Sequence, residues 1–216
     1  MENITFNMAQ SHVYGTAFYD FLGLRKRFFV DQLGWDIPHD NDVEMDQYDN
    51  PTAQYSLVLR DGKVIGRARA MATTAKWGSH TYMLRDALKG KLIDIPPSVM
   101  AADVETDAMW ECTRLVMSDD VDTHADRSMC LGLIVQGLID VAAEQGASHL
   151  MSLSPLALMR ALRQLGFDAE RIGDPNLNEG DGRRYAVLSM PAKRTMPHVP
   201  RATHRPQPQP LHAPSL

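Results

Sequence analysis

The segment YSLVLRDGKVIGRARAM, residues 55–71, constrains the fold of this chain more than any other stretch. Its central Asp61-Gly62 pair favours the left-handed backbone angles of a two-residue hairpin turn, and apolar and β-branched residues flank that pair on both sides. The segment therefore predicts two antiparallel strands joined by a tight turn.

Helices and strands are expected to alternate on both sides of this hairpin. Ahead of it, apolar residues recur at the helical step of three to four residues, at Tyr14, Phe18, Leu22, Phe29 and Leu33. Behind it we predict, in order, a short helix ending near Gly90, a strand at 109–118, a helix at 128–145, a strand at 148–153, a helix that Ser154-Pro155 opens and Gly166 closes, and a strand at 183–190. This order predicts a three-layer α/β (α+β) sandwich with a largely antiparallel sheet.

The size and charge of the chain narrow the class of protein. Its 216 residues suit one domain, and a hydrophobic content of 44% is enough for a sizeable core. The net charge of −5 gives no global basic field for nucleic acid, and no stretch is long enough to span a bilayer. Cys112 and Cys130 have no metal-type spacing and are interpreted as reduced thiols, and the first residues lack a signal-peptide pattern. We therefore expect a cytoplasmic protein.

The C-terminal segment differs in composition from the rest of the chain. Beyond Pro191 the sequence is rich in Pro, His and Arg and has almost no apolar pattern. A segment of this kind buries too little apolar surface to offset the entropy of ordering it. We therefore expect one domain over residues 1–193 and a disordered tail over residues 194–216.

One charged residue lies on the apolar stripe of the first predicted helix. Arg25 follows Leu22 by one turn and precedes Phe29 by one turn. A guanidinium in that position either reaches water along its aliphatic stem or has an anionic partner near the core. On residue statistics alone, reaching water is the commoner outcome.

Other charged residues gather near aromatic residues: Glu44, Asp46 and Asp49 in EMDQYD, Arg69 in GRARAM, and Glu111 with Arg114 in WECTR. Each has an ordinary explanation. Loop acids are usually solvated, Arg69 fits the wet face of a strand, and residues three apart in a regular strand face opposite ways unless a bulge intervenes. Together they suit a zwitterionic ligand, because guanidiniums bind a carboxylate, acids bind an amine, and aromatic rings attract a sulfonium.

Five segments carry a resemblance to a known family. LRKRFFVDQLGW, EMDQYD, GRARAMATT, TYML and WECTR occur in the order and approximate spacing of the acyl-homoserine-lactone synthases, the LuxI-type autoinducer synthases, which the chain resembles over about residues 14 to 190. The resemblance implies a Gnat-type N-acyltransferase fold with a twisted mixed sheet split in a V shape. It also implies an acyltransferase that makes an N-acyl-L-homoserine lactone, a quorum-sensing signal, from S-adenosylmethionine and an acyl thioester, with release of methylthioadenosine.

The resemblance assigns substrate-binding roles to residues of the first helix and of the central strand. Arg25, Phe29 and Trp35 match the family residues that contact S-adenosylmethionine. Arg114 matches the arginine of the central strand and is expected, with Arg25, to hold the substrate carboxylate. S-adenosylmethionine is a substrate, so the resemblance implies no cofactor and no metal.

The resemblance also assigns catalytic roles. Asp46 and Asp49 match the acids of the loop, Glu44 begins their motif, and Arg69 is expected to pair with this loop. Glu111 is the candidate general base for the substrate amine, acting through a water. Neighbouring arginines are expected to keep the pKa of Glu111 low.

The acyl pocket is expected to form after residue 100, with candidate wall residues Met151, Ser152, Leu153, Leu156 and Met159. Ser152 matches a family position where a hydroxyl residue accompanies 3-oxo or 3-hydroxy acyl chains. A hydroxyl can bond the C3 oxygen in an otherwise apolar tunnel. Ser152 therefore predicts a preference for C3-oxygenated chains of medium or long length.

The acyl donor is either acyl carrier protein or acyl-coenzyme A. A strongly acidic carrier protein needs a basic docking patch, for which the candidates are Arg160, Arg163, Arg171, Arg183 and Arg184. Ordinary surface arginines explain these residues equally well.

Two other functions are compatible with these features. An acetyl-coenzyme A-dependent N-acetyltransferase shares the expected fold, but DDVDTHADRSMC lacks the glycines of a pyrophosphate-binding loop. A non-catalytic module that senses S-adenosylmethionine or an acyl chain would share the site and release no methylthioadenosine.

Overall fold

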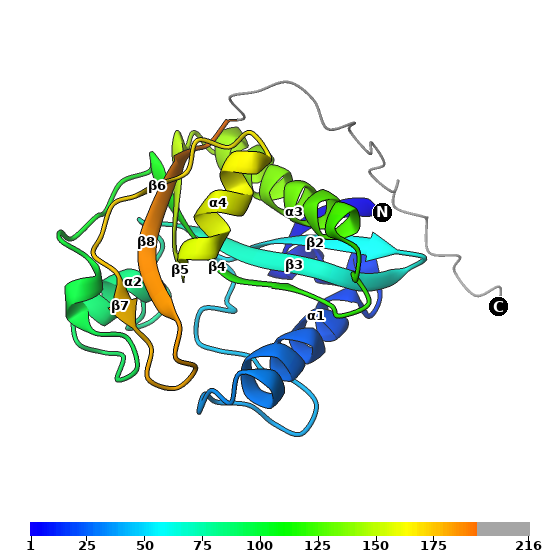
Figure 1. Ribbon diagram of the computed structural model, residues 1–216, viewed down its shortest axis with the longest axis horizontal. Helices are drawn as coiled ribbons and strands as arrows, with labels where there is room; N and C mark the ends of the chain where they lie inside the picture. The colour runs from blue at the N-terminus through cyan, green and yellow to red at the C-terminus, as the bar shows by residue number, and fades with distance from the viewer. Residues whose placement is uncertain (194–216) are drawn as a thin grey trace, which may run out of the picture.

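The architecture is a mixed sheet between two layers of helices (Figure 1). The computed structural model describes residues 1–193, and the predicted tail at 194–216 lies outside them. Eight strands form one sheet in the order β1-β2-β3-β4-β5-β8-β6, with β7 paired to β8. The strands are β1 (Glu2–Asn7), β2 (Gln54–Arg60), β3 (Lys63–Ala72), β4 (Met109–Met117), β5 (His149–Pro155), β6 (Glu170–Arg171), β7 (Asn176–Leu177) and β8 (Arg184–Pro191). Every pair is antiparallel except β4–β5, which confirms the expected sheet.

Helices cover both faces of this sheet. The helical segments are the 3-10 helix η1 (Met8–Tyr14), α1 (Ala17–Arg25), the π-helix η2 (Lys26–Gln32), α2 (Met83–Leu88), the 3-10 turn η3 (Pro97–Val99), α3 (His124–Glu144) and α4 (Leu156–Gln164). α3 lies against one face of the sheet and α1 against the other, so the three-layer prediction is confirmed (Figure 1). None of the helices in residues 1–193 combines the length and the apolar character needed to cross a lipid bilayer.

Strand alternation divides the apolar interior into two cores. Ala68 and Ala70 of β3 pack in the core beneath α3, whereas Met71 packs with Phe21 of α1 in the other core. Arg67 and Arg69 alternate with these alanines and therefore face α1. Because α1 covers this face, the expectation that Arg69 lies on a wet face is wrong, and both arginines are fully buried.

The sheet splits between its two central strands. β4 and β5 pair only where Met109–Glu111 lie opposite His149–Met151. Beyond Glu111, β4 pairs with β3 alone, and beyond Met151, β5 pairs with β8 alone. The sheet is therefore open from this point on, as the predicted V-shaped split requires.

The predicted hairpin forms between β2 and β3. Arg60 pairs with Lys63, and Asp61 and Gly62 have φ angles of 52° and 77°, so the loop has two residues in the left-handed region. These are the angles that an Asp-Gly hairpin turn requires.

A β-bulge in β4 brings Glu111 and Arg114 to the same face of the sheet. Arg69 pairs with Thr113, but Arg67 pairs with Val116, so β4 contains one residue more than β3 between these two pairs. Arg114 lies in this interval with a φ of 55°, a left-handed angle that is costly for an L residue with a long side chain. The extra residue turns Arg114 to the α1 side, which Glu111 also faces.

Several elements differ from the predicted ones, and the short strands β6 and β7 were not predicted. The first helix is interrupted at Gly15 and continues from Lys26 as a π-helix. β1 was not predicted, because few apolar residues mark it. α3 begins at His124, since the Thr123 side chain accepts the N–H of Asp126 and caps the helix earlier than expected. Ser154 does not cap α4, because it still pairs within β5 and its hydroxyl bonds to Ser152.

The close approach of α3 to the sheet at Gly137 yields a testable prediction. A Cβ atom there would lie 2.4 Å from Ser56 Oγ and 2.5 Å from Asn3 Oδ1, and these two side chains are joined by a hydrogen bond that is partly buried. We expect Gly137→Ala to lower the free energy of unfolding by about 1–3 kcal/mol in chemical denaturation. The control is Gly132→Ala in the same helix, where no atom lies within 4 Å, and it should raise stability by up to about 1 kcal/mol. Equal effects of the two substitutions would contradict this packing.

Candidate active site

Arg25 lies at the centre of a buried ion network. Its guanidinium donates Nε–H and Nη2–H to the two carboxylate oxygens of Glu44, the second over 2.7 Å. Nη1 lies 2.5 Å from Asp49 Oδ2, and Nη2 lies 3.2 Å from Asp46 Oδ2. Arg25 has no exposed surface, so it does not reach water. The anionic partner, the second of the two explanations, accounts for its place on the apolar stripe.

Asp46 joins three arginines. Arg69 approaches it through Nη1 at 2.5 Å and Nη2 at 3.1 Å, and Arg114 Nη2 lies 2.9 Å from Asp46 Oδ2. Burial alone would raise the pKa of Asp46, but the charges of Arg69, Arg114 and Arg25 hold it far below its usual range. Asp46 is therefore a permanent anion that fixes the arginines, and it is unsuited to accept a proton near neutral pH.

The acidic loop is fixed to the rest of the fold by backbone and aromatic contacts. Glu44 N–H donates to the carbonyl of Leu22 at 3.2 Å, which attaches the loop to α1. The Tyr48 ring lies 5.6 Å from the Arg69 guanidinium carbon, and the Tyr48 hydroxyl donates to Asp86 at 3.2 Å. Thus a segment without regular secondary structure holds its carboxylates at defined positions.

Arg67 is a buried cation that the sequence analysis did not single out. It has no exposed surface, and none of its three guanidinium nitrogens has a hydrogen-bond acceptor among the described residues. Its guanidinium carbon lies 4.4 Å from the centre of the Phe21 ring, a cation–π contact, and burial lowers its pKa well below the usual value. The signal was the spacing in GRARA, because two arginines two residues apart in a strand face the same way.

Glu111 is buried at the vertex of the sheet split, and its pKa differs from the expected one. Its two oxygens accept the N–H groups of Met83 and Leu84, each at 2.8 Å, at the start of α2. Burial raises the pKa of Glu111 to about 7, although these two hydrogen bonds and the charge of Arg69 act to lower it. The expectation of a low pKa is therefore wrong, because burial outweighs the two hydrogen bonds and the charge of Arg69.

Aromatic residues extend the network toward the opposite arm of the split. The Phe29 ring lies 5.1 Å from the Arg114 guanidinium carbon, and Trp35 stacks on Phe29 with 4.9 Å between ring centres. This stacking follows from the end of η2. Gly34, with a φ of 68°, turns the chain back, and Trp35 N–H bonds to the Phe29 carbonyl at 2.9 Å.

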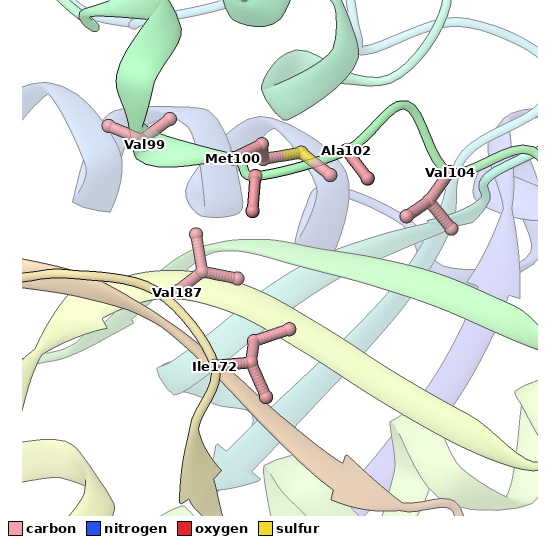
Figure 2. A pocket seen from close by; sticks show the side chains of 7 residues that line it. Val99, Met100, Ala102, Val104, Ile172 and Val187 are labelled. Carbon is pink, nitrogen blue, oxygen red and sulfur yellow. The ribbon is translucent and has the colours of Figure 1, made fainter.

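The structure separates the candidate acyl-pocket residues onto two faces of β5. Met151 and Leu153 belong to the core on the α1 side, whereas Met159 packs in the core beneath α3 and Ser152 faces that same side. An apolar pocket of about 140 Å³ lies on the α1 side, lined by Val99, Met100, Ala101, Ala102, Val104, Ile172 and Val187. Figure 2 shows the loop around Met100 facing Val187 and Ile172 across this pocket. The sequence did not indicate this pocket, because its walls combine the segment 99–104, Ile172 and Val187 of β8, none of which carries a motif.

The five candidate docking arginines are all exposed. They come from different elements: Arg160 and Arg163 from α4, Arg171 from β6, and Arg183 and Arg184 from the β7–β8 hairpin. Arg163 also donates Nε–H to the Ala169 carbonyl at 2.7 Å, so it has a structural role beside any docking role. Their role in docking stays a prediction.

The split sheet with a buried carboxylate at its vertex defines an N-acyltransferase-like fold. A putative N-acetyltransferase from Lactobacillus plantarum matches this fold with a TM-score of 0.52 at 13% identity, over 89% of this chain and 100% of that one. A higher TM-score of 0.70, at 19% identity, relates the chain to BjaI, a CoA-dependent acyl-homoserine lactone synthase solved with SAM and isopentyl-CoA, over 88% of this chain and 82% of that one.

Sequence similarity identifies the family. Residues 9–197 match the family described as autoinducer synthase. An acyl-homoserine-lactone synthase of Acinetobacter nosocomialis is 31% identical over 166 residues, which cover 74% of this chain and 85% of that protein. The chain belongs to the autoinducer synthase family, and the resemblance drawn from its five segments is confirmed.

The contrast between Arg67 and Arg69 yields a prediction about stability. Arg69→Met leaves Asp46 and Asp49 short of a buried partner and should cost about 3–5 kcal/mol of unfolding free energy. Arg67→Met removes a charge that has no acceptor and keeps an unbranched side chain on Phe21, so stability should stay unchanged or rise. Denaturant titration of both variants measures the difference. A loss for Arg67→Met as large as that for Arg69→Met would show that the network needs its charge.

Proposed function

We propose that this chain synthesises an N-acyl-L-homoserine lactone in the cytoplasm from S-adenosylmethionine and an acyl thioester, and releases methylthioadenosine. One observation carries the proposal. The ion network of Arg25, Asp46, Asp49, Arg69 and Arg114 lies on the same face of the sheet as the Glu111 carboxylate, and the Phe29–Trp35 pair borders it. These groups match the three charges of S-adenosylmethionine, which are a carboxylate, an amine and a sulfonium.

The state of the two substrate-facing arginines supports different roles for them. Arg25 is fully buried and its donors are occupied by three carboxylates, which favours a bracing role. The Arg114 side chain is 12% exposed, and its Nε–H has no acceptor among the described residues. Arg114 therefore has donor capacity for the substrate carboxylate, while Arg25 and Arg69 hold the acidic loop in place.

Glu111 is suited to the first chemical step. Each of its oxygens accepts one backbone N–H and keeps a lone pair that can accept a proton from a water. Through that water the carboxylate removes a proton from the substrate ammonium. The amine then attacks the thioester carbonyl and the C–N bond forms. The second proton on the nitrogen passes to the departing sulfur, which leaves as a thiol with the electron pair of the C–S bond.

Lactone closure is an intramolecular displacement. A carboxylate oxygen attacks the γ-carbon of the substrate, the bond from that carbon to sulfur breaks, and sulfur keeps the electron pair as neutral methylthioadenosine. The sulfonium is already a good leaving group, so the protein contributes orientation. Arg114 on the carboxylate and the Phe29–Trp35 pair on the sulfonium would supply it.

The acyl chain is proposed to enter the split beside Ser152. This residue follows Met151, the last residue of β5 that pairs with β4, so Ser152 stands at the point where the two strands part, with its side chain on the α3 side. The hydroxyl already bonds to Ser154 at 2.9 Å, and this pair can offer a donor to a C3 oxygen. Acyl carrier protein and acyl-coenzyme A both remain donors to test, with the five exposed arginines as the docking candidates for the carrier.

The test of the function is the release of methylthioadenosine. The purified chain is mixed with S-adenosylmethionine and a panel of acyl-carrier-protein and acyl-coenzyme A donors that carry unsubstituted, 3-oxo and 3-hydroxy chains. Released methylthioadenosine is measured, and the lactone is identified by mass spectrometry. We expect Asp46→Ala and Arg114→Ala to lower kcat/KM about a hundredfold or more, and the distant Arg60→Met to leave it unchanged. A sensor would bind S-adenosylmethionine without turnover, and an acetyltransferase would release no methylthioadenosine.

The raised pKa of Glu111 predicts the pH dependence. A general base acts as the ionised carboxylate, and burial raises this pKa to about 7, so kcat/KM should fall as the pH drops through about 7. The substrate amine titrates in a nearby range, so Glu111→Gln is compared with the wild type. The variant should lose most of its activity, and its remaining kcat/KM should no longer fall as the pH drops through about 7. If kcat/KM of Glu111→Gln still falls near pH 7, the titrating group is the substrate amine and Glu111 is not the base.

A further inference from the structure

Asp181 is a hydrogen-bonded carboxylate in the loop of the β7–β8 hairpin, outside the ion network. Its Oδ1 accepts the N–H of Arg183 at 2.9 Å, and its Oδ2 accepts the Tyr185 hydroxyl at 2.7 Å. The same Oδ2 accepts the indole N–H of Trp35 at 3.3 Å. Asn178 accepts the N–H groups of Gly180 and Asp181, so the loop that carries this carboxylate is itself fixed.

The Trp35–Asp181 bond joins the two arms of the split sheet. Trp35 follows η2, which continues from α1 on the β3–β4 arm, whereas Asp181 and Tyr185 belong to the β8 arm. In Figure 1 the loop between β7 and β8 approaches the chain that follows α1 and η2. A continuous series therefore runs from Arg114 through Phe29 and Trp35 to Asp181.

The composition of this series is that of a cation-binding site. Phe29, Trp35 and Tyr185 contribute three rings, with 4.9 Å between the first pair of ring centres and 6.3 Å between the second. Burial opposes ionisation of Asp181, but hydrogen bonds from Tyr185, Arg183 and Trp35 lower its pKa below the usual value. Trp35, Asp181 and Tyr185 are all partly exposed, so a ligand in the split can reach them.

We propose that Asp181 and Tyr185 determine specificity for the positively charged sulfur of the substrate by holding Trp35 across the split. This inference rests on one part of the proposed function, the binding of S-adenosylmethionine, and does not depend on turnover. The carboxylate fixes the orientation of the indole and, by accepting its N–H, adds electron density to the ring face that attracts a cation. Neither residue touches the reacting atoms, so both are positioning residues.

The proposal distinguishes a sulfonium from a thioether. Cation–π attraction and the Asp181 charge act on the positive sulfur of S-adenosylmethionine and have little effect on a neutral sulfur. Lactone closure removes the sulfur charge, so methylthioadenosine loses this attraction at the moment it forms. The same contact therefore favours binding of the substrate and departure of the product.

The test compares two ligands that differ by one methyl group and one charge. Calorimetry on the full chain measures Kd for S-adenosylmethionine and for S-adenosylhomocysteine, its thioether analogue, in wild type, Asp181→Asn and Tyr185→Phe. We expect Asp181→Asn to weaken binding of S-adenosylmethionine about tenfold, which corresponds to about 1.4 kcal/mol, and binding of the analogue less than twofold. Tyr185→Phe should also weaken binding of S-adenosylmethionine more than binding of the analogue, but by a smaller factor than Asp181→Asn. The control is Glu179→Gln, an exposed carboxylate of the same loop, which should change neither Kd.

A second experiment tests whether Asp181 acts through the indole of Trp35. Trp35→Phe keeps a ring on Phe29 and removes the N–H donor, so adding Asp181→Asn to it should change the ratio of the two Kd values less than twofold. An equal loss for both ligands in Asp181→Asn, or a full tenfold effect in the Trp35→Phe background, overturns the proposal. Wild type that binds S-adenosylmethionine without releasing methylthioadenosine contradicts the proposed function and leaves this inference standing. Wild type that does not bind it overturns both.

Discussion

The buried pairing of Arg25 with Glu44, Asp46 and Asp49 is the interaction on which the rest of the site depends. Removing charges from water is costly, and mutual attraction offsets that cost only when geometry and hydrogen bonding are nearly complete. The network therefore tolerates few arrangements of the segment between η2 and β2, which has no regular secondary structure of its own to define its path. Charge pairing does for this segment what backbone hydrogen bonding does for the strands.

Two irregularities of the sheet give this network a function. The bulge at Arg114 gives Asp46 a third arginine partner on the α1 face, at the cost of a left-handed φ of 55°. The separation of β4 from β5 after Glu111 leaves a carboxylate at the vertex with no strand beyond it. In a regular, continuous sheet Arg114 would point toward α3, and β5 would occupy the space that a thioester needs. Strain and broken pairing are thus concentrated at the point where chemistry is proposed.

The longer regular elements, except β1, could be predicted from the sequence, and the irregular ones could not. Asp61-Gly62 specifies its turn through local backbone preference, and the apolar face of α3 specifies a buried helix, so local signals suffice for both. The pairing of Arg25 depends on residues about twenty positions further along the chain, and no local pattern encodes it. The bulge at Arg114 follows from pairing with β3, and the pKa of Glu111 follows from burial that only the assembled fold produces. The family resemblance named these residues without giving their geometry.

Charge balance links the binding of the substrate to the protonation of Glu111, the proposed base. The α1 face carries the buried guanidiniums of Arg25, Arg67 and Arg69 and the partly exposed one of Arg114. They lie against the carboxylates of Glu44, Asp46 and Asp49, so an ionised Glu111 makes the group neutral. A substrate carboxylate stabilises a proton on Glu111, whereas a substrate ammonium or sulfonium stabilises the ionised form, and each influence is reciprocal. Because the pKa of Glu111 is about 7, either influence changes its protonation near neutral pH. A zwitterionic, cationic substrate therefore favours the ionised base that its own amine requires.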